Sequence, residues 1–231
     1  MKRFYREVSV GDGYRILLDG RAVKTPKKAE LLIAARRLAE AVASEWDACG
    51  EEIRPADMPL TRLATSVIDL FPERIADARS EIAAYAGHDL VCYRAEPASE
   101  LRARQEREWH PWCDWAERRF GARLRVTEGI IPVAQDRDAL DRLAICAGER
   151  DPWRLMGLHA AVKLTGSAVL GLALAEGELD HGRAFEASML DELFEIERWG
   201  MEEEQAKRHD ALRMEIAAVD RFCRLLDDVS D

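Results

Sequence analysis

Histidine and cysteine are the side chains of this 231-residue sequence best suited to metal or nucleophilic chemistry, and their spacing supports neither. None of the five histidines lies in an H-E-x-x-H or H-x-x-x-H pattern. His110 and Cys113 could share a metal on a helix, but a zinc site needs three or four ligands and no second pair is present. The segment around Trp109 and Trp112 is better explained as a half-buried aromatic helix, so no metal is expected.

Two further patterns resemble parts of enzyme sites and lack a necessary residue. Residues 166–171 have the glycine spacing of a phosphate-binding loop, but Leu172 and Ala173 follow where Lys and Ser or Thr would be needed. The small residues there favour close packing of helices instead. His88 and Asp89 could belong to a catalytic triad, yet no Gly-x-Ser-x-Gly elbow or Cys-Gly signature accompanies them. Neither pattern therefore supports phosphate binding or a catalytic triad.

The elements that position these residues begin with a small antiparallel sheet. Asp19-Gly20 lies between apolar runs, and it is typical of a two-residue hairpin turn that needs positive φ at both positions. From about residue 34 the apolar spacing changes to the helical period and continues almost to the end of the chain. The runs expected to be extended are residues 4–10, 14–18, 22–25 and 30–33, with one later candidate at 124–130.

These patterns predict an α+β fold. A small N-terminal antiparallel β domain with its first helix is expected over residues 1–50, and a larger, mainly α-helical domain over 51–231. Pro72 and Pro152 precede helical runs at positions where the first turn of a helix tolerates proline. A chain of this length with 48% hydrophobic residues can bury a full core.

The compartment and the relation to membranes follow from the cysteines and the apolar segments. Five scattered cysteines without a CxxC pair indicate reduced thiols. Residues 155–175 are apolar but contain Lys163, which costs roughly 2.5 to 3.5 kcal/mol near a bilayer centre, so a buried helix is expected. No leader pattern precedes the first strand. A cytosol-like compartment is therefore expected, and secretion is not.

The formal net charge of -10 is concentrated in one part of the chain. Residues 172–231 hold 17 acidic and 7 basic side chains, which alone account for it, whereas residues 1–54 sum to +2 and 55–171 to -2. Such an acidic segment repels nucleic acid and anionic lipid and attracts a basic protein surface. The sequence therefore predicts a protein partner, no nucleic-acid binding and no membrane insertion.

Several specific sequence strings are not explained by the metal, phosphate-loop and triad patterns considered above. They are L-D-G-R-A-V-K-T-P at 18–26, D-L-V-C-Y-R-A at 89–95, S-A-V-L-G-L-A-L at 167–174, D-E-L-F-E-I at 191–196 and W-G-M-E-E at 199–203. In this order the chain resembles the ATP-twelve family, chaperones that assemble the F-one sector of ATP synthase. Two positions depart from that family: Glu195 replaces its usual glutamine, and the acidic run 202–204 replaces an Asn-containing string of mitochondrial members.

The resemblance implies an ATP-independent chaperone with no cofactor and no enzyme activity. It also implies a location in the bacterial cytoplasm, or in the mitochondrial matrix for a processed eukaryotic form, and a monomer is expected. It would bind the free ATP synthase α-subunit and shield the subunit interface until the β-subunit replaces it. If residues 191–210 were one helix, Glu192, Trp199 and Glu203 would lie within about 40° of one another on one stripe. We therefore predict a partner-binding surface formed by Glu203, Trp199, Glu192 and Glu195, with Glu203 matching the glutamate of the family's W-G-x-x-E string.

Two other functions remain open from the sequence. Carboxylates in a cleft between the two domains could serve a small hydrolase or transferase, and the acidic segment could bind some other protein. Recovery of the α-subunit from a lysate, combined with absence of nucleotide binding, would separate the chaperone from both alternatives.

Overall fold

The N-terminal residues form the predicted antiparallel sheet in a computed structural model, which describes residues 1–129 and 131–227. Its strands are β1 (Val8–Val10), β2 (Ile16–Leu18) and β3 (Arg21–Ala22), in the order β1-β2-β3. The β2–β3 turn has φ of 49° at Asp19 and 75° at Gly20, as the hairpin signature predicts.

The strands are shorter than the apolar runs predicted. Residues 4–7 are not a strand, because the Asp19 carboxylate accepts hydrogen bonds from the amides of Arg6 and Glu7, at 3.0 and 2.9 Å. Residues 30–33 contribute only isolated bridges, one of them between Arg15 and Leu32. In the later extended stretch, β5 (Thr127–Glu128) pairs in parallel with β4 (Tyr93–Arg94), while residue 130 lies outside the described residues.

Most of the chain after the sheet is helical, as the periodicity predicts. The longer helices are α1 (Arg36–Asp47), α2 (Pro59–Asp69), α3 (Ile75–Gly87), α4 (Glu100–Phe120), α5 (Arg137–Gly148), α6 (Pro152–Thr165), α7 (Ala168–Ala175), α8 (His181–Ser188), α9 (Leu190–Trp199) and α10 (Glu203–Leu226). The α+β fold class is confirmed.

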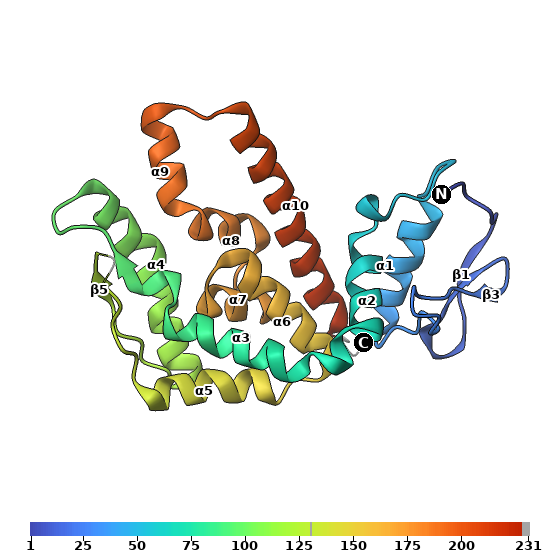
Figure 1. The fold of residues 1–231 in the computed structure, drawn as a ribbon, viewed down its shortest axis with the longest axis horizontal. Coiled ribbons are helices and arrows are strands. Elements are labelled where there is room, and N and C mark those ends of the chain that lie inside the picture. Colours follow the sequence, from blue (N-terminus) through green and yellow to red (C-terminus); the bar gives the residue numbers. More distant parts are fainter. Residues whose placement is uncertain (130, 228–231) are drawn as a thin grey trace.

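The helices gather on two sides of a long C-terminal helix (Figure 1). The sheet, α1 and α2 lie on one side of α10, and the bundle of α3 to α8 lies on the other. α10 contacts α6 and α8 in the bundle and also contacts α1 and α2. The predicted domain division at residue 50 stays a prediction, and α2, which follows that position, contacts α1 as well as α6.

The bundle is built around α6 and α7, which the glycine-rich segment joins. A Cβ added at Gly171 would lie 2.5 Å from Val162 Cγ2 and 2.8 Å from the Val162 backbone nitrogen. Only glycine therefore allows the two helices to approach this closely, which confirms the packing interpretation of residues 166–171. Among the described residues, no helix combines the length and the apolar content needed to cross a membrane.

The Asp89 carboxylate caps two helices instead of serving a catalytic triad. It is fully buried and accepts hydrogen bonds from Ser167 Oγ at 2.5 Å, the Val169 amide at 3.0 Å and the Val91 amide at 3.2 Å. Burial raises the pKa of Asp89 to about 6, against the opposing effect of these hydrogen bonds. Asp89 thus fixes the start of α7 against the turn after α3.

This raised pKa predicts a pH-dependent stability. The folded state binds the Asp89 proton more tightly than the unfolded chain, so its stabilising contribution is complete below about pH 4 and is lost as the pH rises through about 6. Between these limits, the free energy of unfolding of the parent should fall by about 2 to 3 kcal/mol relative to Asp89→Asn. Urea denaturation of both proteins at several pH values measures this, and a difference independent of pH would contradict it.

Candidate protein-docking site

The acidic segment forms two helices, so the predicted single-helix stripe is wrong. Gly200 has φ of 88° and ψ of 169°, a conformation that essentially only glycine adopts, and it ends α9. Glu202 then begins α10 through a capping box, in which its side chain accepts from the Gln205 amide and Gln205 Oε1 accepts from the Glu202 amide at 3.4 Å. Glu203 consequently lies in the first turn of α10 and not on the helix that carries Trp199.

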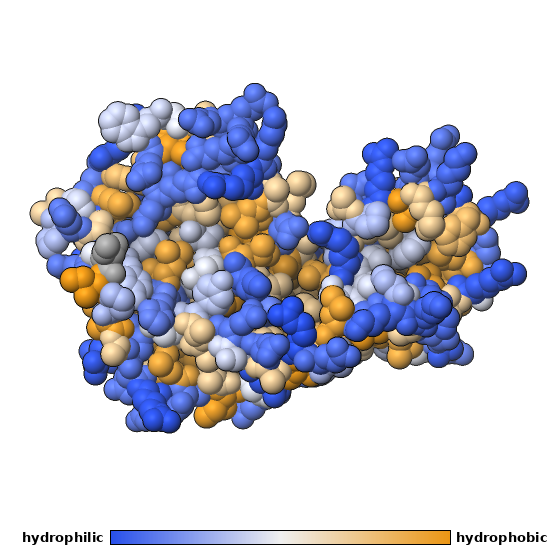
Figure 2. Space-filling view, in the orientation of Figure 1, coloured by the Kyte–Doolittle hydropathy of each residue, from blue (hydrophilic) through white to orange (hydrophobic). Residues whose placement is uncertain are grey.

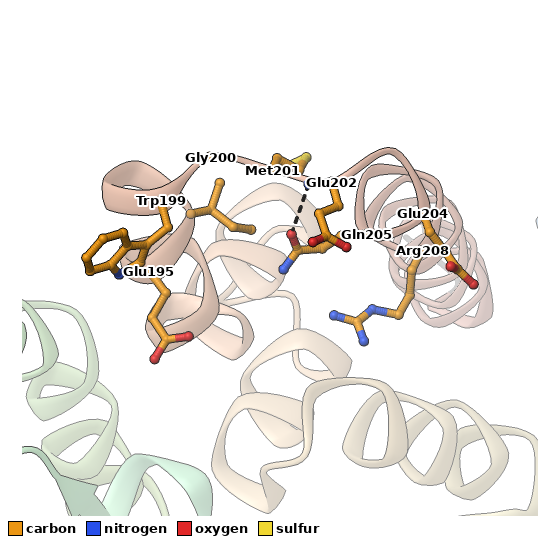
Figure 3. Close-up of a pocket in the computed structure, with 9 residues that line it drawn as sticks. Glu195, Trp199, Gly200, Met201, Glu202, Glu204, Gln205 and Arg208 are labelled. Atoms are coloured by element: carbon orange, nitrogen blue, oxygen red, sulfur yellow. Dashed lines mark hydrogen bonds between the residues drawn. The ribbon is translucent and has the colours of Figure 1, made fainter.

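A pocket of about 850 Å³ opens where α9 meets α10, and we call it the junction pocket (Figure 3). Gln205 and Arg208 project from α10 toward α9, whereas Trp199 and Glu195 line the pocket from α9 with their side chains directed away from α10. Figure 2 shows hydrophilic residues gathered over these two helix ends. The residues that line it are Glu195, Ile196, Trp199, Gly200, Met201, Glu202, Glu204, Gln205 and Arg208.

Trp199 is an exposed aromatic side chain at the rim of this pocket. It is 85% exposed, and the neighbouring Met201 is 44% exposed. A partner that covers the indole would remove a large apolar area from water. Tryptophan is also enriched among the residues that contribute most of the binding free energy at protein interfaces. At this exposure Trp199 contributes almost nothing to the core, as expected for a side chain available to a partner.

The carboxylates around Trp199 differ in how they are paired. Within the described residues, Glu195, Glu202 and Glu204 are exposed and form no ion pair. Glu203 is also exposed, at 84% of its side chain, but pairs with Lys207 at 2.6 Å and does not line the junction pocket. The unpaired negative charge therefore lies at Glu195, which was predicted as a site residue, and at Glu202 and Glu204, which were not.

Glu192 faces α10 instead of the junction pocket. Its Oε1 accepts a hydrogen bond from Gln205 Nε2 at 2.7 Å, lies 3.0 Å from His209 Nε2 and pairs with Arg208. Burial alone would raise its pKa, but the hydrogen bonds from Gln205 and His209 and the charge of Arg208 outweigh burial and hold the pKa of Glu192 below its usual range. The carboxylate thus ties the two helices together.

α9 is also attached along its length to α4. Gln105 Nε2 donates to Asp191 Oδ1 at 2.8 Å, Arg104 pairs with Glu197 at 2.7 Å, and a third bridge joins the far end of α9 to Glu100. Phe194 turns inward and is 8% exposed. These contacts hold the helix that presents Trp199, and no sequence pattern predicted them.

Trp109 and Cys113, from the segment considered for a metal site, lie in the packed interior of the helical bundle. Trp109 is 1% exposed and donates from Nε1 to the Ala187 carbonyl at 2.8 Å, and Cys113 is 7% exposed. The aromatic helix around them is confirmed. Within residues 1–129 and 131–227, no group of three or more His, Cys, Asp or Glu side chains is arranged to hold a metal ion. All five cysteines are free thiols.

Comparison with known proteins identifies the family. Residues 2–117 match the ATP12 chaperone protein family. The chain is 24% identical over 224 residues to the mitochondrial protein atp12 of Schizosaccharomyces pombe, covering 92% of this chain and 75% of that protein. It is 37% identical to Atp12 from Paracoccus denitrificans, whose crystal structure superposes with a TM-score of 0.92 over 98% of both chains.

A second solved structure, the Atu1473 protein from Agrobacterium tumefaciens, shares 37% identity and a TM-score of 0.93, and the match covers 98% of this chain and 86% of that one. These structural matches extend beyond the family match and include α9 and α10. The sequence strings, the fold and the extent of these matches together show that the chain belongs to the ATP12 family of chaperones.

Proposed function

We propose that this protein is an ATP-independent chaperone for assembly of the F-one sector of ATP synthase, and that it holds the free α-subunit at the junction pocket. Family membership supports assembly of ATP synthase as the process. The observation that carries the binding site is Trp199, 85% exposed beside the unpaired carboxylates of Glu195, Glu202 and Glu204. Glu203 lies next to this surface in the first turn of α10, exposed and paired with Lys207.

The surface suits a partner segment that carries both an apolar and a basic group. The apolar group would cover the indole of Trp199, and the basic group would meet the carboxylates that have no cation of their own. A free subunit exposes an interface that is later covered, and such apolar surfaces aggregate. Reversible binding at this site would keep that surface of the α-subunit covered until the β-subunit replaces the chaperone.

Reconstitution from purified components tests the proposal. The protein should form a complex with isolated α-subunit, suppress its aggregation without added ATP, and release it when β-subunit is supplied. Calorimetry with ATP alone should show no saturable binding. Failure to bind α-subunit, with a different protein recovered from a lysate, would favour the alternative of a scaffold for another partner, and saturable nucleotide binding would favour an enzyme.

Charge reversal at neighbouring positions locates the binding carboxylates. Glu204→Lys and Glu203→Lys should each fold normally, because both side chains are exposed, and each should weaken α-subunit binding about tenfold, since an exposed ion pair contributes up to about 1 kcal/mol and reversal adds repulsion. The loss should shrink at high salt. Glu178→Lys is the matched control, because Glu178 is exposed between α7 and α8, outside the junction pocket.

The pair of variants also separates two versions of the site. If Glu204→Lys binds weakly while Glu203→Lys binds like Glu178→Lys, Glu203 is not part of the surface and the pocket-lining carboxylates provide the charge. If all three variants bind like the parent, the acidic surface is not the docking site.

A further inference from the structure

Arg208 is the one cationic side chain among the described residues that line the junction pocket. It follows Glu204 by four residues on α10, the spacing at which a glutamate and a following basic residue pair across one helical turn. Arg208 pairs instead with Glu192 on α9, and Glu204 is left without a cation. The choice that Arg208 makes between these two carboxylates therefore sets the charge of the pocket.

The surroundings of Glu192 favour this choice. The Glu192 side chain is 27% exposed, so its attraction for Arg208 is screened less by water than that of the exposed Glu204. The same carboxylate oxygen also accepts a hydrogen bond from Gln205 Nε2 and lies 3.0 Å from Nε2 of His209, whose side chain is fully buried. These contacts fix the acceptor in place before Arg208 binds, which lowers the entropy lost when the arginine pairs with it.

We propose that Glu192 is a positioning residue that holds Arg208 away from Glu204 and so keeps the junction pocket acidic for the basic group of the partner. In this arrangement Glu192 acts through Arg208 and does not itself touch the partner, which differs from the direct role that the sequence pattern suggested. The inference rests on the proposed function for the identity of the partner, but the switch of Arg208 between two carboxylates does not depend on it.

The first test needs no partner. A crystal structure of Glu192→Gln should show the Arg208 guanidinium within salt-bridge distance of the Glu204 carboxylate, with α9 and α10 otherwise in place. Glutamine is chosen because its amide oxygen still accepts a hydrogen bond from Gln205 or His209, while the charge that attracts Arg208 is gone. If Arg208 keeps its parent position in this variant, the proposal is overturned.

The second test measures α-subunit binding by four proteins: the parent, Glu192→Gln, Arg208→Gln and the double variant. Glu192→Gln should bind about five- to tenfold more weakly, because the freed arginine neutralises Glu204. Arg208→Gln should bind at least as tightly as the parent. The double variant should return to within about twofold of Arg208→Gln, since without the arginine the charge of Glu192 no longer matters.

The outcomes separate a positioning role from the others. A double variant as weak as Glu192→Gln would mean that Glu192 contacts the partner directly or is needed for the fold, and would overturn the proposal. Equal binding by Glu192→Gln and the parent would also overturn it. If the parent itself fails to bind α-subunit while Arg208 moves as expected in the crystal structure, the proposed function is wrong and the positioning role stands.

Discussion

Trp199→Ala is expected to weaken binding of the α-subunit by about 100- to 1000-fold, or about 3 to 4 kcal/mol, while leaving the free energy of unfolding unchanged. The reason is the contrast between its 85% exposure in the free protein and the large apolar area that a partner would bury over the indole. Titration calorimetry with isolated α-subunit and urea denaturation of the free protein measure the two quantities.

Phe4→Ala is the control for this substitution. Phe4 is also a large exposed aromatic, at 65%, but it lies in the N-terminal segment and does not line the junction pocket. Phe4→Ala should bind α-subunit within about twofold of the parent if the position of Trp199 at the rim of the junction pocket, and not its exposure alone, determines the loss. Equal losses for Phe4→Ala and Trp199→Ala would show that exposed aromatic area in general, and not the junction pocket, holds the partner.

Trp109→Ala should have the opposite effect, with a loss of about 3 to 5 kcal/mol in the free energy of unfolding. Trp109 is 1% exposed, its indole nitrogen donates to the Ala187 carbonyl at 2.8 Å, and the Arg94 guanidinium lies 5.2 Å from its ring centre. Alanine would leave a cavity between α4 and α8 and an unpaired buried carbonyl.

Denaturant midpoints of Trp109→Ala and Trp199→Ala provide the comparison, because the same side chain is removed from a buried and an exposed position. A stability loss below about 1 kcal/mol for Trp109→Ala would show that the core around α4 collapses into the space or that the indole contributes little. Trp199→Ala should unfold at the denaturant concentration of the parent.

Features determined by neighbouring residues were predictable from the sequence. The Asp19-Gly20 turn follows from the φ angles that these two residues tolerate, and the close packing around Gly171 follows from the lack of a side chain. The break at Gly200 had a local signal as well, because Glu202 and Gln205 have the spacing of a capping box. The uniform helical spacing of residues 191–210 conceals this break, because the apolar period continues across Gly200.

Features that depend on the angle between helices were not predictable in this way. Glu192 meets residues 13 to 17 positions later only because the chain turns back at Gly200, and Asp191 meets Gln105 from a helix 86 positions earlier. The helical period around Trp199 is equally compatible with a core and a surface position. Its exposure depends on where α9 ends relative to α4, which no short sequence pattern specifies.

The turn between α9 and α10 is a part of the protein where the sequence can change with little effect on stability. Residues 199–204 are all exposed, and the packing that holds the two helices lies in other residues, among them Phe194 and His209. Substitutions at the tip, apart from Gly200 and the capping residue Glu202, should therefore cost the fold little. Charged residues at the tip can therefore be exchanged to match a partner of different charge. The helical hairpin of α9 and α10 is thus a position where binding specificity can be redesigned without changing the core.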